Sequence, residues 1–415
     1  MKIGLMGFGT IGTGVYELIN IQGKSRFSDS AAMPAVITKI LDKDPNKKVY
    51  DGDQNAVIVS NVDDILEDPD IELVIALCGG MDFEYNNIKK AMRKGKHVVT
   101  ANKAVISEYF EELTTIAKEN NVILRYEASV GGGIPIISSL KDQLKLNHVD
   151  EIKGIINGTT NYILTKMAEE NAAFDDALKG AQAIGYAEAD PTADIAGHDI
   201  ARKLAILSSL AYGGIIRDED VRKRPLGEVS AEDITYCARK GWTIKYLGHS
   251  KCVDNKVYTT VEPVIVPKTS VLGNVDSVSN IISIHGDVIN ELQFYGLGAG
   301  KEATANAVVS DVLNVIRDIK YHIPQERESF EYAVERCGTT AFEGRYYWRI
   351  VPDSADALSK AQAVLGDLET EWQSETIGQQ LFLISTTPHT ADKMDEKALQ
   401  LRADGIKLFY ARLYD

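Results

Sequence analysis

The fold of this 415-residue chain is decided by its opening stretch, Lys2-Ile3-Gly4-Leu5-Met6-Gly7-Phe8-Gly9-Thr10-Ile11-Gly12. The apolar run Lys2–Met6 predicts a buried β-strand, and the helical spacing of Ile11–Ile21 predicts a helix directly after it. The glycines between them permit a tight turn and a close approach of the backbone, and the helix N-terminus attracts a pyrophosphate. We therefore expect a dinucleotide-binding turn with contacts from Gly7, Gly9, Thr10, Ile11 and Gly12.

Strand-like and helix-like patterns continue to alternate through the first third of the chain. Helical patterns cover Glu84–Arg93 and Glu108–Asn120, and the expected strands are Val36–Leu41, Glu72–Leu77, His97–Ala101 and Val122–Tyr126. This alternation is typical of βαβ units around a parallel sheet. The predicted fold class is α/β, with a Rossmann-type doubly wound parallel sheet.

The residues after the second expected strand leave the choice between NAD and NADP open. Asp42 ends that strand, and an acidic side chain at this place binds the ribose 2′-hydroxyl of NAD. Lys43, Lys47 and Lys48 follow, and their ammonium groups could instead hold the 2′-phosphate of NADP. Ordinary solvated lysines are an equal alternative.

The remainder of the chain predicts two further domains. Helical and then alternating strand patterns predict an α+β domain at 129–300, for substrate binding and oligomerisation. The helix pattern Thr304–Lys320 returns to the first domain, so we assign 1–128 and 301–325 to dinucleotide binding. A charged linker, 326–343, leads to a β-α-β-β-α-β pattern at 344–415, the element order of a ferredoxin-like unit.

The composition limits the class of protein and its partners. Apolar residues make up 44% and charged residues 25%, the proportions of packed globular protein. The 60 acidic and 45 basic side chains give a net charge of −15, which disfavours nucleic-acid and anionic-membrane partners. The chain shows no secretory signal and no apolar run that could span a bilayer, and its four cysteines are far apart. We expect a cytoplasmic protein.

The segment Gly185–Lys203 carries the densest pattern of charged residues. Asp199 and Lys203 fall on one helical face, beside an apolar stripe that would partly bury them. Four nearby carboxylates, those of Glu188, Asp190, Asp194 and Asp199, resist burial unless cations such as a substrate amino group balance them. The alternative is a surface ion pair of little consequence.

Lys103 lies just beyond the carboxyl end of the expected strand His97–Ala101. Ligands of open α/β sheets bind outside such ends. A partly desolvated lysine there has a lowered pKa and can transfer a proton. By position alone, a surface lysine is an equally good interpretation.

Several motifs together resemble those of homoserine dehydrogenases. They are the glycine turn, VVTANKA around Lys103, YEASVGGGIPI at Tyr126–Ile136, NGTTNYI at Asn157–Ile163, GYAEADPTADIAGHDIARKLAIL at Gly185–Leu207, GLGAG at Gly296–Gly300, and Asp311. The resemblance extends over nearly the whole chain. The Gly185–Leu207 block is far more specific than any dinucleotide fingerprint.

The resemblance implies NAD(P)H-dependent, reversible reduction of L-aspartate 4-semialdehyde to L-homoserine, in threonine and methionine biosynthesis. Lys103, which would also contact the cofactor, and Lys203 would be the proton-transfer lysines, with Asp199 orienting Lys203. The substrate would be bound by Glu188, Asp194, Gly158, Thr159 and Tyr186. The chemistry agrees, because hydride transfer to an aldehyde leaves an alkoxide that a lysine ammonium stabilises and protonates.

The resemblance also implies a structural monovalent cation, Na⁺, near Glu127 and the carbonyls of Val130, Gly132 and Ile134. A plain solvated Glu127 carboxylate is the alternative. The C-terminal unit resembles an ACT domain, an amino-acid-sensing module. It would either bind threonine as an effector or join the subunits of a homodimer or homotetramer.

The chain departs from the family pattern at three places. Ala76 stands ahead of the pair Gly79-Gly80, where an acidic residue is usual, and Ala303 replaces a proline after GLGAG. Asp356 occupies a turn position that is usually glycine in the ACT-like unit. A Cβ at that turn could block the close approach of a ligand.

Two other functions compete with this interpretation. An aspartate-semialdehyde dehydrogenase needs a nucleophilic cysteine, and Cys78 in the nucleotide-binding part has no obvious partner histidine. A catalytically inactive amino-acid sensor could keep the same fold. The intact residues Lys103, Asp199 and Lys203 argue against the sensor.

Overall fold

The computed structural model of the chain describes residues 1–23, 35–44, 47, 49, 56–324, 328, 330, 334–352 and 355–414. Lys48 and part of the linker predicted at 326–343 lie outside the described residues. The chain forms two compact units: unit 1 comprises Met1–Val149, Ala205–Arg217 and Phe294–Ala333, and unit 2 comprises Asp150–Leu204, Asp218–Gln293 and Val334–Asp415. The finer division into four segments stays a prediction. None of the helices within the described ranges is both long and apolar enough to cross a membrane.

Unit 1 is built on a six-stranded parallel sheet in the order β3-β2-β1-β4-β5-β6. The strands are β1 (Lys2–Met6), β2 (Val36–Leu41), β3 (Val57–Val59), β4 (Ile71–Ala76), β5 (His97–Thr100) and β6 (Leu124–Arg125). This is the Rossmann strand order, so the predicted parallel sheet is confirmed. The order reverses between β1 and β4, and ligands of such sheets bind beyond the carboxyl ends of the strands at that point.

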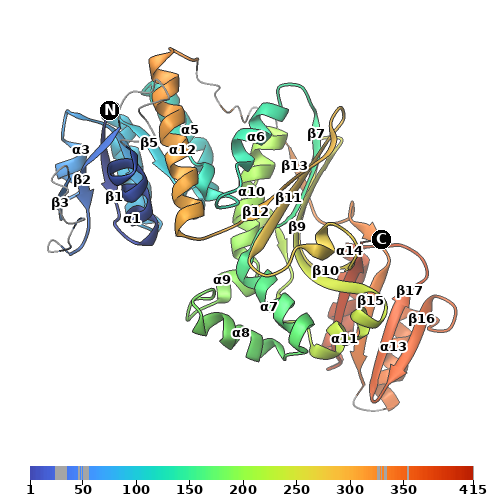
Figure 1. Cartoon of the computed structure of the whole chain (residues 1–415). Coiled ribbons are helices and arrows are strands. Elements are labelled where there is room, and N and C mark those ends of the chain that lie inside the picture. The colour runs from blue at the N-terminus through green and yellow to red at the C-terminus, as the bar shows by residue number, and fades with distance from the viewer. Residues whose placement is uncertain are drawn as a thin grey trace. The chain divides into compact units, whose positions relative to one another are not determined.

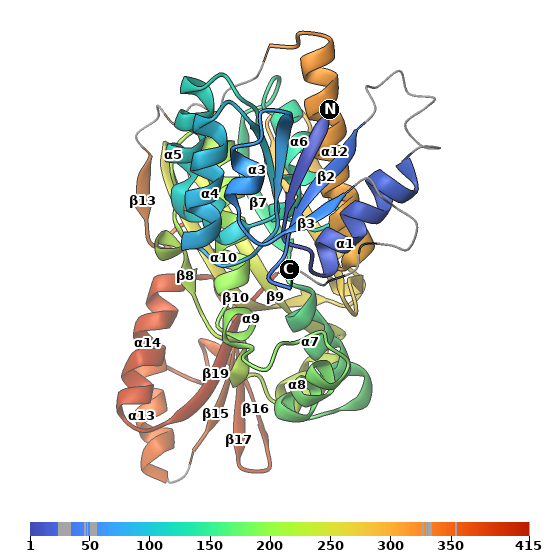
Figure 2. The same cartoon turned by 90° about the vertical axis from the view of Figure 1, so that its left-hand side faces the viewer.

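Helices cover both faces of this sheet. The helices of unit 1 are α1 (Thr10–Tyr16), α3 (Asp63–Leu66), α4 (Asp82–Arg93), α5 (Lys103–Glu119), α6 (Ile136–Gln143) and α12 (Lys301–Lys320). The pair α1 and α12 lies side by side on one face (Figure 1), and α4 and α5 lie on the opposite face (Figure 2). Val308 and Val312 of α12 pack in one core with Ile3 and Leu5 of β1. The central strands are therefore buried on both faces, which explains their continuous apolar runs.

Two helices of unit 1 differ from the predicted ranges by more than three residues at one end. Helix α5 begins at Lys103 rather than at Glu108, because the Asn102 side chain accepts hydrogen bonds from the N–H groups of Ala104 and Val105 and caps the helix there. The helix expected over Ile11–Ile21 is α-helical only as far as Tyr16 and continues as a π-helical turn to Ile21.

Unit 2 contributes to a separate mixed sheet, with the order β12-β11-β7-β9-β10-β19-β15-β17-β16. Its strands are β7 (Val149–Ile155), β9 (Trp242–Val253), β10 (Lys256–Pro267), β11 (Ser279–Gly286), β12 (Asn290–Leu297), β15 (Tyr346–Val351), β16 (Trp372–Ile377), β17 (Gln380–Ser385) and β19 (Lys407–Leu413). Short strands β8 (Arg222–Lys223) and β13 (Glu335–Cys337) also pair with β10, while β14 (Glu343–Gly344) and β18 (His389–Thr390) pair with each other. The helices that begin in unit 2 are α7 (Gly158–Glu170), α8 (Phe174–Ala183), α9 (Thr192–Ile195), α10 (His198–Tyr212), α11 (Ala231–Arg239), α13 (Ala355–Leu365) and α14 (Ala391–Ala403).

The C-terminal elements follow the expected order, β15-α13-β16-β17-α14-β19, and neighbouring strands of this part are antiparallel. The strands of this part and strands β7, β9 and β10 belong to one continuous sheet. The two parts meet where β19 pairs in parallel with β10, with Arg412 opposite Val264. The face that carries Phe382 packs on Tyr236 of α11, and the two rings are stacked at 4.7 Å. The β-α-β-β-α-β part is thus joined to the rest of unit 2 through both a strand edge and a sheet face.

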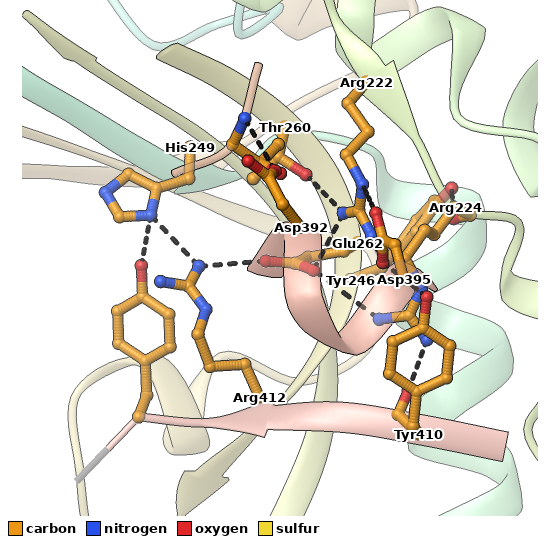
Figure 3. A network of polar contacts seen from close by, with 12 residues as sticks. Arg222, Arg224, Tyr246, His249, Thr260, Glu262, Asp392, Asp395, Tyr410 and Arg412 are labelled. Carbon is orange, nitrogen blue, oxygen red and sulfur yellow. Dashed lines mark hydrogen bonds and ion pairs between the residues drawn. The ribbon is translucent and has the colours of Figure 1, made fainter. Parts of the chain in front are cut away.

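Buried charges hold this junction together (Figure 3). Glu262 of β10 is 1% exposed and accepts hydrogen bonds from Arg412 of β19 at 2.9 Å and from Arg222 of β8 at 3.1 Å. Arg224 lies 3.5 Å from the same carboxylate. Arg222 also pairs with Asp395 of α14. Burial alone would raise the pKa of Glu262, but the charges of the three arginines lower it to about 2.

Replacing Glu262 by Gln removes the carboxylate that the three arginines share. We expect the free energy of unfolding to fall by about 3–5 kcal/mol at pH 7, because buried guanidinium groups lose their counter-charge. Urea denaturation measures this loss. Since the pKa of Glu262 in the folded protein lies below its ordinary value of 4.5, the stabilisation is present above that pH and is lost as the pH falls towards 2.

The matched control is Glu170→Gln, which breaks an exposed pair with Lys166 in α7. An exposed pair of this kind contributes about 0.5 kcal/mol at most. An equally small loss for both variants would show that the Glu262 network does not stabilise the junction.

Candidate functional site

In the turn between β1 and α1, each glycine is explained by a different physical reason. Gly7 has a φ of +101°, which disfavours other residues. A Cβ on Gly12 would lie 2.1 Å from the Gly7 carbonyl oxygen, so the helix approaches the turn too closely for a side chain. A Cβ on Gly9 would meet nothing within 4 Å. Packing therefore does not explain Gly9, whereas the open space beside it fits the approach of a pyrophosphate.

Asp42 follows β2 and lies close to this turn. Lys47 Nζ donates to the Asp42 carboxylate at 2.8 Å and also to the carbonyl of Phe8. Burial would raise the pKa of Asp42, but the hydrogen bond from Lys47 lowers it overall. The side chain of Lys43 is exposed. A carboxylate and an ammonium group therefore lie side by side after β2, next to the glycine turn.

The loop after β4 is held by a carboxylate that the sequence analysis missed. Glu84 is completely buried and accepts hydrogen bonds from Gly79 N–H at 2.8 Å and from Thr100 Oγ1 at 2.9 Å. Burial raises its pKa, although these bonds partly offset the effect. Glu84 lies on the buried stripe of α4 with Ile88 and Ala91. A carboxylate in an apolar stripe is the sequence signal that could have identified it.

Lys103 is the first residue of α5 and is half-buried. The helix start is tied to the glycine loop after β4, because Asn102 Nδ2 donates to the Gly80 carbonyl at 3.0 Å. The backbone at Gly79 and Gly80 adopts positive φ, and a Cβ on either would meet nothing within 4 Å. Two open glycine loops and Lys103 thus lie at the carboxyl edge of the parallel sheet.

Cys78 lies in the same loop and is not poised as a nucleophile. Burial, with a smaller contribution from the charge of Glu84, raises the pKa of its thiol to about 12. The thiol therefore stays protonated at neutral pH, whereas acyl transfer needs a thiolate. This environment argues against an aspartate-semialdehyde dehydrogenase.

The Asp199 and Lys203 side chains of α10 form a buried ion pair in unit 2. Asp199 is 5% exposed and Lys203 is 8% exposed, and Lys203 Nζ lies 2.7 Å from Asp199 Oδ2. The ammonium group also donates to the Ile156 carbonyl at 2.7 Å. The apolar stripe beside the pair is buried as expected, including Ile200 and Leu204. The pair is therefore not an ordinary surface salt bridge.

Asp194 joins this pair through a residue to which the sequence analysis assigned no role. Asn157 Nδ2 donates both to Asp194 Oδ1 at 2.7 Å and to Asp199 Oδ2 at 2.9 Å. By contrast, Glu188 and Asp190 are exposed. Asp190 accepts hydrogen bonds from Thr192, which begins α9. The structure thus brings together two of the four carboxylates in the segment.

The residues predicted to line the substrate pocket lie at the start of α7 and in the loop after α8. Gly158 is the first residue of α7, and Thr159 Oγ1 donates to the Tyr186 carbonyl at 2.7 Å. Tyr186 is 46% exposed, and its ring meets that of Tyr162 edge to face at 5.1 Å. Thr159 and Tyr186 are therefore in contact within unit 2.

Glu127 is buried in unit 1, at the N-terminus of α6. Its carboxylate accepts hydrogen bonds from the N–H groups of Ile137 at 2.7 Å and Ser138 at 2.9 Å. Its own N–H donates to the buried carboxylate of Asp311 at 2.8 Å. Burial and the charge of Glu127 raise the pKa of Asp311 to about 7. Glu127 is thus not a plain solvated carboxylate.

The loop that follows Glu127 packs tightly against the backbone of Gly298. A Cβ on Gly132 would lie 2.4 Å from the Gly298 carbonyl oxygen. Val130 and Ile134 are buried, and the Ile134 carbonyl accepts a hydrogen bond from Ile136 N–H. Across the described part of the chain, no group of three or more His, Cys, Asp or Glu side chains could hold a metal ion. A cation here would therefore depend on backbone carbonyls.

Comparison with known proteins assigns the nucleotide-binding sheet and the part that follows it to one family. A family model described as the homoserine dehydrogenase NAD binding domain matches residues 7–127, and one described as homoserine dehydrogenase matches residues 135–313. Homoserine dehydrogenase from Bacillus subtilis is 38% identical over 371 residues, which are 88% of this chain and 85% of that protein.

Solved structures give the same result. The structure of a homoserine dehydrogenase from Thiobacillus denitrificans superposes with a TM-score of 0.89 at 31% identity, covering 100% of this chain and 98% of that chain. A hyperthermophilic archaeal homoserine dehydrogenase in complex with NADPH covers 78% of this chain and 98% of that chain, with a TM-score of 0.65 at 26% identity. The chain therefore belongs to the homoserine dehydrogenase family.

Proposed function

We propose that the protein catalyses the NAD(P)H-dependent, reversible reduction of L-aspartate 4-semialdehyde to L-homoserine. The observation that carries this proposal is the buried Asp199–Lys203 pair on one face of α10. An ammonium group held by a carboxylate and a carbonyl is oriented to donate a proton to a substrate oxygen.

In the proposed mechanism, Lys203 stabilises the oxygen of the aldehyde and protonates it as negative charge develops. Asp199 fixes the direction of the Lys203 side chain. Lys103 of unit 1 is proposed as a second proton-transfer lysine and as a contact for the cofactor. The nicotinamide, when bound, supplies the hydride for the aldehyde carbon. The cofactor fits the residues present, because the space beside Gly9 is open at the N-terminus of α1.

Recognition of the substrate amino acid is assigned to the carboxylates Glu188 and Asp194, which would bind its ammonium group. Gly158, Thr159 and Tyr186 would line the pocket. The partial exposure of Tyr186 and Glu188 supports this role, because a substrate must reach them from solvent.

The C-terminal β-α-β-β-α-β part is proposed to be an ACT-like domain. Asp356, where glycine is usual, lies in the first turn of α13 and pairs with Lys360 at 2.9 Å. Residues 353–354 lie outside the described residues. Threonine binding and the association of subunits into a dimer or tetramer both remain proposals for this domain. Turnover assays with and without threonine separate the two roles. A change in turnover would support threonine binding, and an unchanged turnover would support a role in subunit association alone. A cytoplasmic location is proposed as well.

The catalytic assignment is tested with Lys203→Met. The wild-type protein should oxidise NADPH or NADH when aspartate semialdehyde is added, and the variant should lose turnover by about 10²–10⁴-fold, the contribution of a general acid. Cofactor binding, measured by nicotinamide fluorescence, should be unchanged. The control is Lys166→Met, the same substitution in an exposed ion pair of α7. No oxidation by the wild type would indicate an inactive sensor, and full turnover of Lys203→Met would refute the role of the lysine.

The choice of cofactor is tested with Asp42→Ala. This substitution removes a negative charge that repels a 2′-phosphate and releases Lys47 to bind it. We expect the ratio of kcat/KM for NADPH to that for NADH to rise by about tenfold, equivalent to about 1.4 kcal/mol. Steady-state kinetics with both cofactors measures the ratio. Asp68→Ala breaks a comparable pair with Lys39 and should leave it unchanged. An unchanged ratio in Asp42→Ala would place the ribose elsewhere.

A structural monovalent cation is proposed beside Glu127, with ligands from the carbonyls of Val130, Gly132 and Ile134. It fits the residues present, because Glu127 and Asp311 are buried carboxylates that repel each other, and hard oxygen ligands suit Na⁺. The melting temperature should be higher in NaCl than in choline chloride of equal ionic strength, since an ion that binds only the folded state stabilises it. Glu127→Gln should abolish this difference. Equal melting temperatures of the wild type in both salts would argue against the site.

A further inference from the structure

The side chain of Asn157 connects three groups of the proposed proton-transfer site. It is 4% exposed and follows Ile156, whose carbonyl accepts a hydrogen bond from Lys203. Its Nδ2 atom donates to Asp194 Oδ1 at 2.7 Å and to Asp199 Oδ2 at 2.9 Å. The latter oxygen is also the one that accepts the hydrogen bond from Lys203 Nζ.

The orientation of the Asn157 amide is determined by its neighbours. Its Oδ1 atom accepts hydrogen bonds from Thr160 N–H and from Thr160 Oγ1, both at 2.8 Å, and so caps α7. A flipped amide would place its oxygen against two carboxylates and its NH₂ group against a backbone N–H. The two N–H bonds of the amide must therefore point at Asp194 and Asp199.

The geometry also explains why a neutral donor is needed at this position. Asp194 and Asp199 each place an oxygen within 2.9 Å of one nitrogen atom, so their negative charges repel each other. A primary amide offers one N–H to each carboxylate without adding a charge. Asn157 thus holds the two carboxylates side by side.

We infer that Asn157 is a positioning residue for the reaction. Its amide holds Asp199, and through Asp199 the Lys203 ammonium, in the direction that proton transfer requires. It also links this pair to Asp194, the carboxylate assigned to the substrate ammonium group. The inference rests on the proposed role of Lys203.

Two substitutions separate this role from helix capping. Ser and Asp are both as good at a helix N-cap as Asn, so Asn157→Ser and Asn157→Asp should keep the cap of α7. Neither can offer two N–H groups. A lost hydrogen bond to a charged group costs about 1.5–3 kcal/mol, so kcat should fall by about tenfold to 150-fold in Asn157→Ser. KM for the substrate should rise less, because the hydrogen bonds of the Asn157 amide go to Asp194, Asp199 and Thr160.

The pH dependence of turnover in the Asn157→Asp variant is a further readout. It would not change if Asn157 had only a structural role. The new carboxylate faces Asp194 of α9 and Asp199 and Lys203 of α10, and it adds a third negative charge there. As the pH falls, this carboxyl group gains a proton and becomes a hydrogen-bond donor. Its turnover relative to wild type should therefore recover between pH 8 and pH 5.5, whereas that of Asn157→Ser should not.

Ser230→Ala is the control, because Ser230 caps α11 and belongs to none of the proposed sites. It should lower the melting temperature and leave kcat and KM unchanged. Turnover of both Asn157 variants within twofold of wild type, or an equal loss in both at every pH, would overturn the positioning role. If Lys203→Met itself retains full turnover, the proposed mechanism fails instead, whatever the Asn157 variants do.

Discussion

The proposed site depends on one constraint, the burial of Lys203. This residue is only 8% exposed, although its side chain ends in an ammonium group. Removing such a charge from water is costly unless an opposite charge and further hydrogen bonds compensate for it. Asp199 supplies the charge, and Ile156 supplies a carbonyl. Helix α10 places both side chains of the pair one turn apart, so the geometry of the site follows from the rigidity of the helix.

The same helix is packed against the strands that carry the Glu262 network. A Cβ on Gly197, just before α10, would lie 2.5 Å from the hydroxyl of Tyr246 on β9. That hydroxyl donates to the Arg224 carbonyl, and the Arg224 guanidinium stacks on the ring of Tyr410 at 3.5 Å. A continuous series of close contacts therefore runs from β19 to the start of the helix that carries Lys203.

Local patterns made the parallel sheet and the ion pair predictable. The glycine turn follows its strand directly, and Asp199 and Lys203 are four residues apart, so both are visible in a short window of sequence. Asn157 lies 37 and 42 residues from the carboxylates that it bridges, and Glu262 lies 150 residues from Arg412. Such contacts depend on tertiary packing, which a single sequence does not reveal.

The pairing of β19 with β10 has a consequence for how this enzyme can be divided. A chain shortened to end before β15 would leave Val264 and Ile265 of β10 without their strand neighbour and would expose the ring of Tyr236 on α11. Unpaired strand residues and exposed aromatic rings favour contacts with other chains. The C-terminal part therefore covers surface that the rest of unit 2 would otherwise expose.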